Sequence, residues 1–292
     1  MVTEQRPGMK QVNLSVPTYT VAFNQTNTSD RPITTASASV ATTELIGIAP
    51  PYRPEALMLE APAAEEAIQL TYRGGQLLSE VEVITTFWGD GWEQQPQSDI
   101  LQGISQFFDF ILTSELMDQL AEYSVDGQTI GQGQHLGASI VTPSQPFGNE
   151  VSDAQLQQLL QDFLAGNPDV PQPTSNRLYF LYLPPGVEVV MTGGDRSCQK
   201  FCGYHSSIQG NIFYAVMPFP CEGGCTGGLA VLDALTSVSS HELCEAVTDA
   251  VPGQGWYNDR QGEIGDICAW QQKQVGDYTV QKEWSNQANA CI

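Results

Sequence analysis

The sequence predicts one α/β domain with a mixed sheet, preceded by an extended N-terminal arm. From residue 67 onward, runs with the two-residue period of strands alternate with runs with the 3.6-residue period of helices. Residues 1–66 are instead rich in Thr, Ser, Pro and Ala. A chain of 292 residues can bury one substantial core or two small ones. We therefore expect an arm at 1–66 and a single domain at 67–292.

One alternating run stands out in the arm. Residues 12–16 and 19–23 alternate apolar and polar side chains on either side of Pro17. Because proline cannot donate a hydrogen bond to a neighbouring strand, this pattern predicts an edge strand. The rest of the arm shows no helical or strand period. We expect the arm either to cross the functional site as a pro-segment or to bind the sheet edge of a second copy in a homo-oligomer. The alternative is a disordered tail.

A hairpin is predicted where the domain begins. Residues 68–73 and 77–88 are strand-like, and the glycine pair Gly74 and Gly75 separates them. Later apolar runs at 178–183, 187–191, 212–217 and 278–282 predict further strands.

Residues 130–141 are expected to form a loop or a strand that carries His135. We expect His135 at the surface, because no acidic or thiol residue lies near it in the sequence.

Three helices are predicted from apolar stripes that follow capping residues. The expected caps are Ser98 with Asp99, Thr113 with Ser114, and Ser152 with Asp153. The third helix should end at Gly166, because glycine readily adopts the left-handed conformation that ends many helices.

The charge of the chain limits its partners. Its 33 Asp and Glu residues against 11 Lys and Arg residues give a formal net charge of −22, and the basic residues form no cluster. A nucleic-acid backbone or an anionic membrane surface would be repelled. No run approaches the ~18 apolar residues of a membrane span. We therefore expect no nucleic acid and no membrane span.

Cysteine usage indicates an oxidising compartment. Six of the seven cysteines lie as if paired, although connectivity cannot be read from sequence. The expected pairs are Cys198 with Cys202, Cys221 with Cys225, and Cys268 with Cys291. Cys244 is expected to be the free thiol. The alternative is a structural zinc site of the first four cysteines with His205.

Disulfides and a low content of charged residues, 15%, predict a secreted protein. Residues 1–10 nevertheless contain no apolar core of a signal peptide, so the route of export stays open.

The candidate site lies within residues 229–268. Its centre, 241–249, reads HELCEAVTD. A helical period places His241, Glu245 and Asp249 on one face. Side chains four residues apart lean the same way, so a histidine and a carboxylate at this spacing can reach one metal ion.

Three further acidic residues complete the pattern. Glu242 would lie beside the metal, in the position of a general base, and Glu263 and Asp266 form a second acidic pair. The pattern resembles the zinc helix of thermolysin-type (gluzincin) metallopeptidases, which read HExxH followed about twenty residues later by a ligand glutamate and an orienting aspartate. By that resemblance His241 and Glu263 bind zinc, Glu242 is the base and Asp266 orients a ligand.

The sequence departs from that family at Glu245, which stands where the second histidine is expected. A carboxylate can bind zinc, but this more anionic site favours calcium or manganese more than the gluzincin site does. The short spacing from Glu245 to Glu263 also allows Asp266 to be the remote ligand. The expected metal ligands are therefore His241, Glu245, Glu263 and Asp266. An ordinary solvated acidic helix face would give the same short pattern.

A second resemblance covers most of the domain. The chain is similar to the Exordium, or phosphate-induced secreted, family, which is extracellular and linked to growth. The motifs that carry it are the run 72–78 leading into Phe87, Trp88 and Gly89, the spacing Cys198-x-x-x-Cys202-Gly203-x-His205-Ser206, and Cys221-x-x-x-Cys225. This resemblance implies secretion more than a mechanism.

Three functions follow as expectations. The first is a secreted zinc-dependent hydrolase, a metallopeptidase acting on a peptide or protein, with Glu242 as the general base. The second is a non-catalytic module that holds calcium through Glu245, Asp249, Glu263 and Asp266. The third is a structural assembly subunit. His205 is expected to be satisfied within its own disulfide loop, although such a loop can also carry it to the site.

Overall fold

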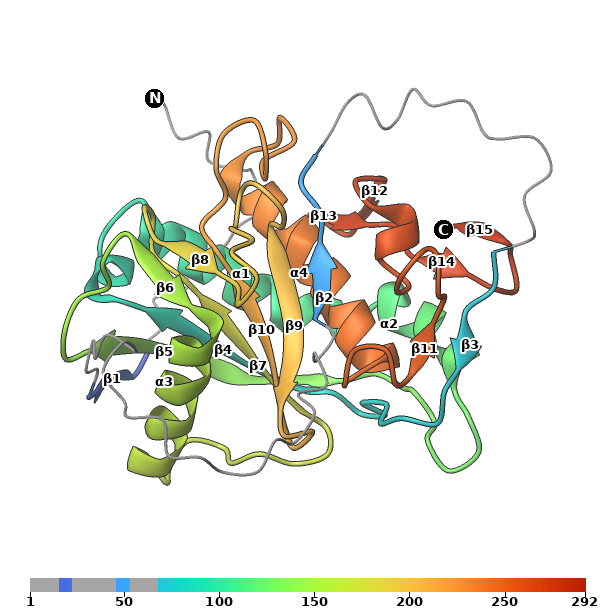
Figure 1. The fold of residues 1–292 in the computed structure, drawn as a ribbon, viewed down its shortest axis with the longest axis horizontal. Helices are drawn as coiled ribbons and strands as arrows, with labels where there is room; N and C mark the ends of the chain where they lie inside the picture. The colour runs from blue at the N-terminus through green and yellow to red at the C-terminus, as the bar shows by residue number, and fades with distance from the viewer. Residues whose placement is uncertain (1–15, 23–45, 53–67) are drawn as a thin grey trace.

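The computed structural model describes residues 16–22, 46–52 and 68–292. A seven-stranded mixed sheet lies at its centre (Figure 1). In spatial order its strands are β1 (Thr18–Val21), β5 (Gln134–Pro143), β4 (Glu82–Trp88), β7 (Arg177–Tyr182), β10 (Ile212–Met217), β9 (Gly203–Ile208) and β2 (Gly47–Ala49). The first five are parallel, whereas β9 runs antiparallel to both β10 and β2. The predicted mixed-sheet α/β class is therefore confirmed.

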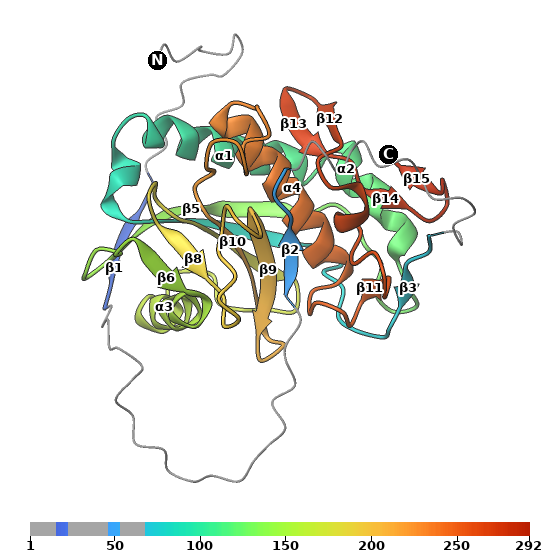
Figure 2. The ribbon, with the colours of Figure 1, turned by 45° about the horizontal axis from the view of Figure 1, so that its top comes forward.

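Helices cover both faces of the sheet. The described α-helices are α1 (Gln97–Ile111), α2 (Glu115–Gln119), α3 (Asp153–Gly166) and α4 (Val231–Thr248). Figure 2 shows α3 on one face and α1 with α4 on the other. In β7, Leu178 and Phe180 join the core with α1 and α4, whereas Tyr179 and Leu181 join the core with α3. Strands buried on both faces are expected to be continuously apolar, as β7 is.

The predicted helices are present, but one start differs. Ser114 accepts a hydrogen bond from the N–H of Leu116 at the start of α2, and Ser152 forms a capping box with Gln155 at the start of α3. α1 instead begins after Pro96, without a side-chain cap. The predicted cap at Ser98 and Asp99 is therefore wrong, and both residues lie in the first turn of α1.

The hairpin predicted around Gly74 and Gly75 is also wrong. β3 (Thr71–Tyr72) pairs with β11 (Trp256–Tyr257), and β4 pairs with β5 and β7. Gly75 shows the physical reason. Its N–H donates to the carbonyl of Gln254 at 2.7 Å, and a Cβ at Gly75 would lie 2.5 Å from that oxygen. Gly75 therefore serves a close approach between distant segments, whereas Gly74 adopts a φ of +95° with nothing within 4 Å of a Cβ there.

Both described parts of the N-terminal segment join the sheet. β1 lies at its edge, as predicted, although residues 12–15 and 23 of the alternating run lie outside the described residues. β2 was not predicted, and it forms the other edge by pairing with β9. A three-residue strand is too short to show a period, which explains why the sequence did not reveal it.

Shorter elements surround the main sheet. The small sheets, besides β3 with β11, are β6 (Glu150–Ser152) with β8 (Glu188–Val190), β12 (Gln272–Val275) with β13 (Tyr278–Gln281), and β14 (Trp284–Ser285) with β15 (Ala290–Cys291). Single 3-10 turns occur at η3 (Asp90–Glu93), η4 (Leu120–Tyr123) and η5 (Asp266–Cys268).

Disulfide connectivity differs from the expected pairs in part. The bonds are Cys198–Cys221, Cys202–Cys225 and Cys268–Cys291. The last bond and the free, buried Cys244 are as predicted. The first four cysteines pair between the two loops rather than within each, because neighbouring loops bring the two CxxxC segments side by side. Their sulfurs are consumed in disulfides, so the alternative structural zinc site with His205 is not formed.

His135 is not a surface residue. Its side chain is 3% exposed, and its Nδ1 lies 2.7 Å from Asp109 Oδ1. Burial lowers the pKa of His135 despite this acidic neighbour. Asp109 belongs to α1, 26 residues away in sequence, so only the packing of α1 on β5 brings the two together.

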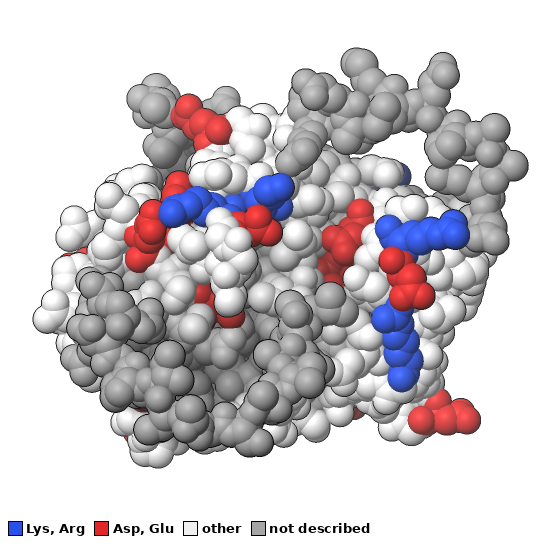
Figure 3. All heavy atoms as spheres, viewed as in Figure 1, with Lys and Arg blue, Asp and Glu red and all other residues white. Residues whose placement is uncertain are grey.

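The surface carries few basic side chains. On the face shown in Figure 3, Lys and Arg lie in small groups beside acidic residues. Arg196, for example, contacts Glu150 and Glu188, and Arg73 contacts Asp259. Within the described ranges, no helix has both the length and the apolar character needed to cross a membrane.

Candidate metal centre

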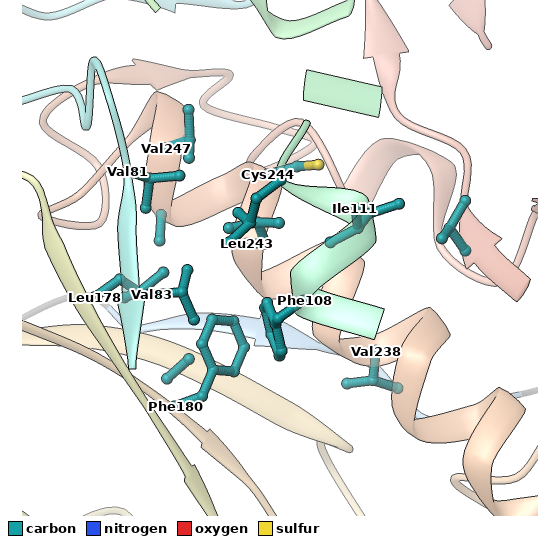
Figure 4. Packing of buried hydrophobic residues seen from close by; sticks show 14 of the residues in the cluster. Val81, Val83, Phe108, Ile111, Leu178, Phe180, Val238, Leu243, Cys244 and Val247 are labelled. Atoms are coloured by element: carbon teal, nitrogen blue, oxygen red, sulfur yellow. The ribbon is translucent and has the colours of Figure 1, made fainter. Parts of the chain in front are cut away.

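The centre is built on α4, which is buried beyond its first turn. Figure 4 shows Val238, Leu243 and Val247 of this helix in one core with Phe108 of α1 and Phe180 of β7. This packing fixes the rotation of α4 about its axis. The acidic side chains Glu242 and Glu245 therefore face β2, β9 and the turn at 263–266.

Asp249 lies just beyond the end of α4 and does not continue its polar face. Its N–H donates to the carbonyl of Glu245 at 2.7 Å. Its carboxylate accepts hydrogen bonds from the N–H groups of Gly253, Gln254 and Gly255 at 2.6, 3.0 and 2.5 Å. Asp249 therefore holds the turn that leads the chain back toward the second acidic pair.

Glu245 lies at the middle of the centre, with each oxygen facing a different histidine. Its Oε1 is 3.0 Å from His241 Nε2, and its Oε2 is 3.5 Å from His205 Nδ1. The N–H of Asp266 donates to Oε1 at 3.1 Å. A carboxylate placed in this way can be shared by two groups of ligands.

His205 belongs to the centre, and the expectation that its disulfide loop satisfies it is wrong. It is fully buried on β9. Its Nε2 donates to the carbonyl of Asp249 at 3.2 Å, and its Nδ1 lies 3.3 Å from Glu242 Oε2. Nothing in the spacing of the sequence signals this position, because the antiparallel pairing of β9 with β10 brings His205 to α4.

Glu263 and Asp266 reach the centre from a tight turn. Glu263 Oε1 lies 3.4 Å from His205 Nε2, and Asp266 Oδ2 accepts the N–H of Glu263 at 3.0 Å. A Cβ at Gly265 would lie 2.7 Å from His241 Nδ1 and 2.9 Å from Glu245 Oε1. Glycine at 265 therefore lets the turn lie directly on the helix.

Glu242 faces the opposite side of the centre from His241. Its Oε1 accepts the N–H of Ala49 at 3.1 Å, and its Oε2 faces His205. Gly203 of β9 makes room for it, since a Cβ there would lie 3.0 Å from Glu242 Oε1. The predicted base is therefore oriented by β2 and β9.

Gln281 of β13 holds His241 in place, and the sequence did not reveal this role. Its amide nitrogen donates to His241 Nδ1 at 2.8 Å and to the carbonyl of Gly265 at 2.9 Å. Its amide oxygen accepts the N–H of Trp270 at 3.1 Å. In this arrangement a neutral His241 carries its proton on Nε2. Metal binding at Nε2 requires that proton to move to Nδ1 and the Gln281 amide to turn.

The charges of the centre perturb one another strongly. Burial alone would raise the pKa of Glu245, but the charge of His241 and the contact with His205 hold it at about 2. Burial and the charge of Glu245 raise the pKa of Asp266 to about 7. Burial raises the pKa of Glu263 well above its usual range. The metal-free centre therefore holds protons that a cation would displace.

The donor atoms fit a metal ion. His241 Nε2, Glu245 Oε2 and Glu263 Oε1 are buried and have no hydrogen-bond partner among the described residues. Atoms at ~2.0–2.1 Å from a tetrahedral zinc ion lie roughly 3.3 Å from one another. The 3.0 Å between His241 Nε2 and Glu245 Oε1 is close to that spacing, whereas the contacts of Glu245 Oε2 at 3.5 Å and Glu263 Oε1 at 3.4 Å are with the ring of His205.

Two groups of three donors meet at Glu245. One contains His205, Glu245 and Glu263, and the other contains His241, Glu245 and Asp266, with ligand atoms within 4.8 Å of one another in each. Three of the four sequence-predicted ligands, His241, Glu245 and Asp266, thus form one group, whereas Glu263 lies with His205 and Glu245 in the other. Mixed nitrogen and oxygen donors suit zinc or manganese better than calcium.

Comparison with known proteins found no family model that matches the chain and no matching curated protein. The resemblances to gluzincins and to the Exordium family therefore stay predictions, and the function is argued from the geometry of the centre.

Proposed function

We propose that the protein is a secreted metal-dependent hydrolase, a zinc peptidase that uses Glu242 as its general base. One observation carries the proposal. Among the described residues, His241 Nε2, Glu245 Oε2 and Glu263 Oε1 are buried without a hydrogen-bond partner, and these residues belong to two groups of possible ligands that share Glu245. Leaving such atoms unpaired is costly unless a ligand completes them.

The two histidines differ in their suitability as ligands. Both ring nitrogens of His205 contact hydrogen-bond acceptors, whereas Nε2 of His241 faces only the carboxylate of Glu245, itself an assigned ligand. We therefore assign the metal to His241, Glu245 and Asp266, with Glu263 adjacent. His205 is assigned to the positioning of Glu242 through the 3.3 Å contact between Nδ1 and Oε2.

The residues of the centre divide the chemistry among them. A bound zinc ion would supply the Lewis acid that polarises a peptide carbonyl and acidifies water. Glu242 takes the proton of that water and returns it to the leaving amine. Burial raises the pKa of Glu242, which moves it toward the range that suits a base at neutral pH. Gln281, with its amide turned so that its oxygen accepts the Nδ1–H, would hold the ring of His241 in place.

A second candidate is a non-catalytic protein with a structural cation. It is favoured by burial, because Glu242, Glu245 and Glu263 are each at most 1% exposed. The predicted calcium set also included Asp249, whose carboxylate already accepts three main-chain N–H groups. The histidine donors are also atypical for calcium, so a structural zinc ion is the better form of this alternative.

The variant Glu242→Gln separates the two candidates. It removes the base but none of the assigned ligands, so we expect metal content to stay unchanged while metal-dependent hydrolysis of labelled casein is lost. Glu283→Gln is the matched control, because Glu283 is also a fully buried glutamate and lies outside the assigned machinery. If Glu242→Gln also loses the metal, Glu242 is a ligand and the proposed mechanism fails.

A further inference from the structure

We propose that the edge of β9 beside the metal centre is a binding site for an extended peptide, and that β2 of this chain occupies it as an internal inhibitor. The inference rests on the proposed function, because it names what that centre binds and how it is kept closed. β2 is the last strand of the sheet in the described chain, and its only ladder partner there is β9.

The contacts of β2 with the centre are made by its main chain. Gly47 lies opposite His205 in the antiparallel register. The N–H of Ala49 donates to Glu242 Oε1 at 3.1 Å, and the carbonyl of Ala49 accepts the N–H of Cys202 at 2.7 Å. Any extended peptide can offer these groups to a sheet edge, which is the usual basis of strand addition.

Gly47 lies directly on the centre. A Cβ at this position would be 2.1 Å from His205 Cε1 and 2.3 Å from Glu263 Oε2. A peptide bound in the same register therefore needs glycine opposite His205. The same contact shows that β2 fills the space in front of the side chains of His205 and Glu263.

Residues that follow β2 add a second point of recognition. The indole N–H of Trp270 donates to the carbonyl of Pro50 at 2.7 Å, and the ring of Tyr52 meets the Trp270 ring at 5.5 Å. The N–H of Tyr52 donates to the carbonyl of Gly224 at 2.8 Å. The site therefore selects a glycine followed five residues later by an aromatic side chain.

Burial shows why β2 must leave before a substrate enters. His205, Glu242 and Glu245 are fully buried beneath the sheet edge and against α4. β2 contributes only three residues at that edge, of which Ala49 reaches the core, whereas α4 contributes many of its residues to the core. Displacing β2 exposes the edge of β9, the carboxylate of Glu242 and the ring of His205 together.

Peptide binding to the full-length chain tests the proposal without relying on catalysis. The probe is a fluorescent peptide with the sequence of residues 46–52, measured by anisotropy in EDTA. Gly47→Val should force β2 off the edge, and Tyr52→Ala should weaken its anchor without touching the centre. Tyr19→Ala is the matched control. Tyr19 lies on β1, the opposite edge strand, and makes a similar ring contact with Phe163 of α3.

We expect both test variants to bind the peptide at least about tenfold more tightly than the wild type and the control do. A peptide with valine in place of its glycine should not bind. Folded variants, verified by circular dichroism, that fail to take up the peptide would overturn the proposal. If Gly47→Val does not fold, Tyr52→Ala decides alone. Peptide binding without zinc-dependent hydrolysis would support the peptide site and contradict the proposed enzyme.

Discussion

Glu245 links the two halves of the centre, because one of its oxygens faces His241 and the other faces His205. Removing this side chain takes a donor from both groups of ligands at once. A partner that only orients a ligand is typically worth about 10- to 100-fold in metal affinity. The loss on removing Glu245 should exceed that range.

The variants Glu245→Ala, His241→Ala and His205→Ala test the assignment of ligands. We expect Glu245→Ala and His241→Ala to abolish stoichiometric zinc binding in calorimetric titration. His205→Ala should retain zinc but lower the hydrolytic rate, because it removes the contact that positions Glu242 and none of the three assigned ligands. Zinc loss in His205→Ala with retention in His241→Ala would show that the ion belongs to the other group.

Gln281 is expected to tune the metal through His241. Replacing it with alanine removes the side chain that holds the imidazole ring, so zinc affinity should fall about 10- to 100-fold. The control is Gln274→Ala, which removes the hydrogen bond of an amide to Thr279 on the neighbouring strand. Equal zinc dissociation constants for the two variants would show that Gln281 does not support the ligand.

For single residues, the helical spacing predicted that the side chains of His241 and Glu245 approach each other. In the structure His241 Nε2 lies 3.0 Å from Glu245 Oε1. The position of Gln281 could not be predicted, and that of His205 was expected only as the alternative in which its disulfide loop carries it to the site. Both residues reach α4 through strand pairings and a loop whose geometry depends on the whole fold, and no short motif records such contacts.

Among the elements, β9 and β2 shape the metal centre as much as α4 does, because both contact Glu242. Long periodic segments such as α1 and α3, and apolar strands such as β7 and β10, were predictable because each carries its burial pattern in its own residues. The strand β2 and the pairing of β3 with β11 were not, because two or three residues hold no periodic signal. A glycine pair likewise signals either a tight turn or a close approach, and the sequence alone does not separate them.

The disulfide Cys268–Cys291 connects the C-terminus to η5, which begins at Asp266. Replacing both cysteines with serine should cost about 2–4 kcal/mol of unfolding free energy. It should also weaken zinc binding, because it loosens the turn that carries Glu263 and Asp266.

The double variant Cys198→Ser/Cys221→Ser is the matched control, since both bonds join residues with a sequence separation of 23. The entropic effect on the unfolded chain is then the same for both. The control should lose stability in urea unfolding while its zinc affinity is retained. A similar loss of zinc affinity in both would show that the effect is general destabilisation.

For the whole molecule, the buried charges make the stability of the metal-free protein depend on pH. Asp266 has a pKa of about 7 when folded and 3.8 ordinarily. The folded protein therefore holds a proton that the unfolded chain loses, and stability falls as pH rises through this window. Glu245 acts in the opposite sense, since its pKa of about 2 lies below 4.5. Its contribution is lost as pH falls from 4.5 toward 2.

The metal-free protein should consequently be most stable between about pH 4 and 5. Melting temperatures in EDTA should decline from there to about pH 8. Zinc should raise the melting temperature more at about pH 8 than at about pH 5, because it replaces protons that are already lost. A melting temperature in EDTA that rises steadily across this range would contradict these charge assignments.

The central claim is that the buried cluster on α4 is a zinc site, and elemental analysis tests it most directly. The full-length chain would be purified without added metal and without chelators, alongside Glu245→Ala. We predict about one zinc ion per wild-type chain and none in the variant, with anomalous scattering at the zinc edge located between His241, Glu245 and Asp266. Protein that folds and melts normally but contains no zinc, or equal zinc in both proteins, would contradict the account.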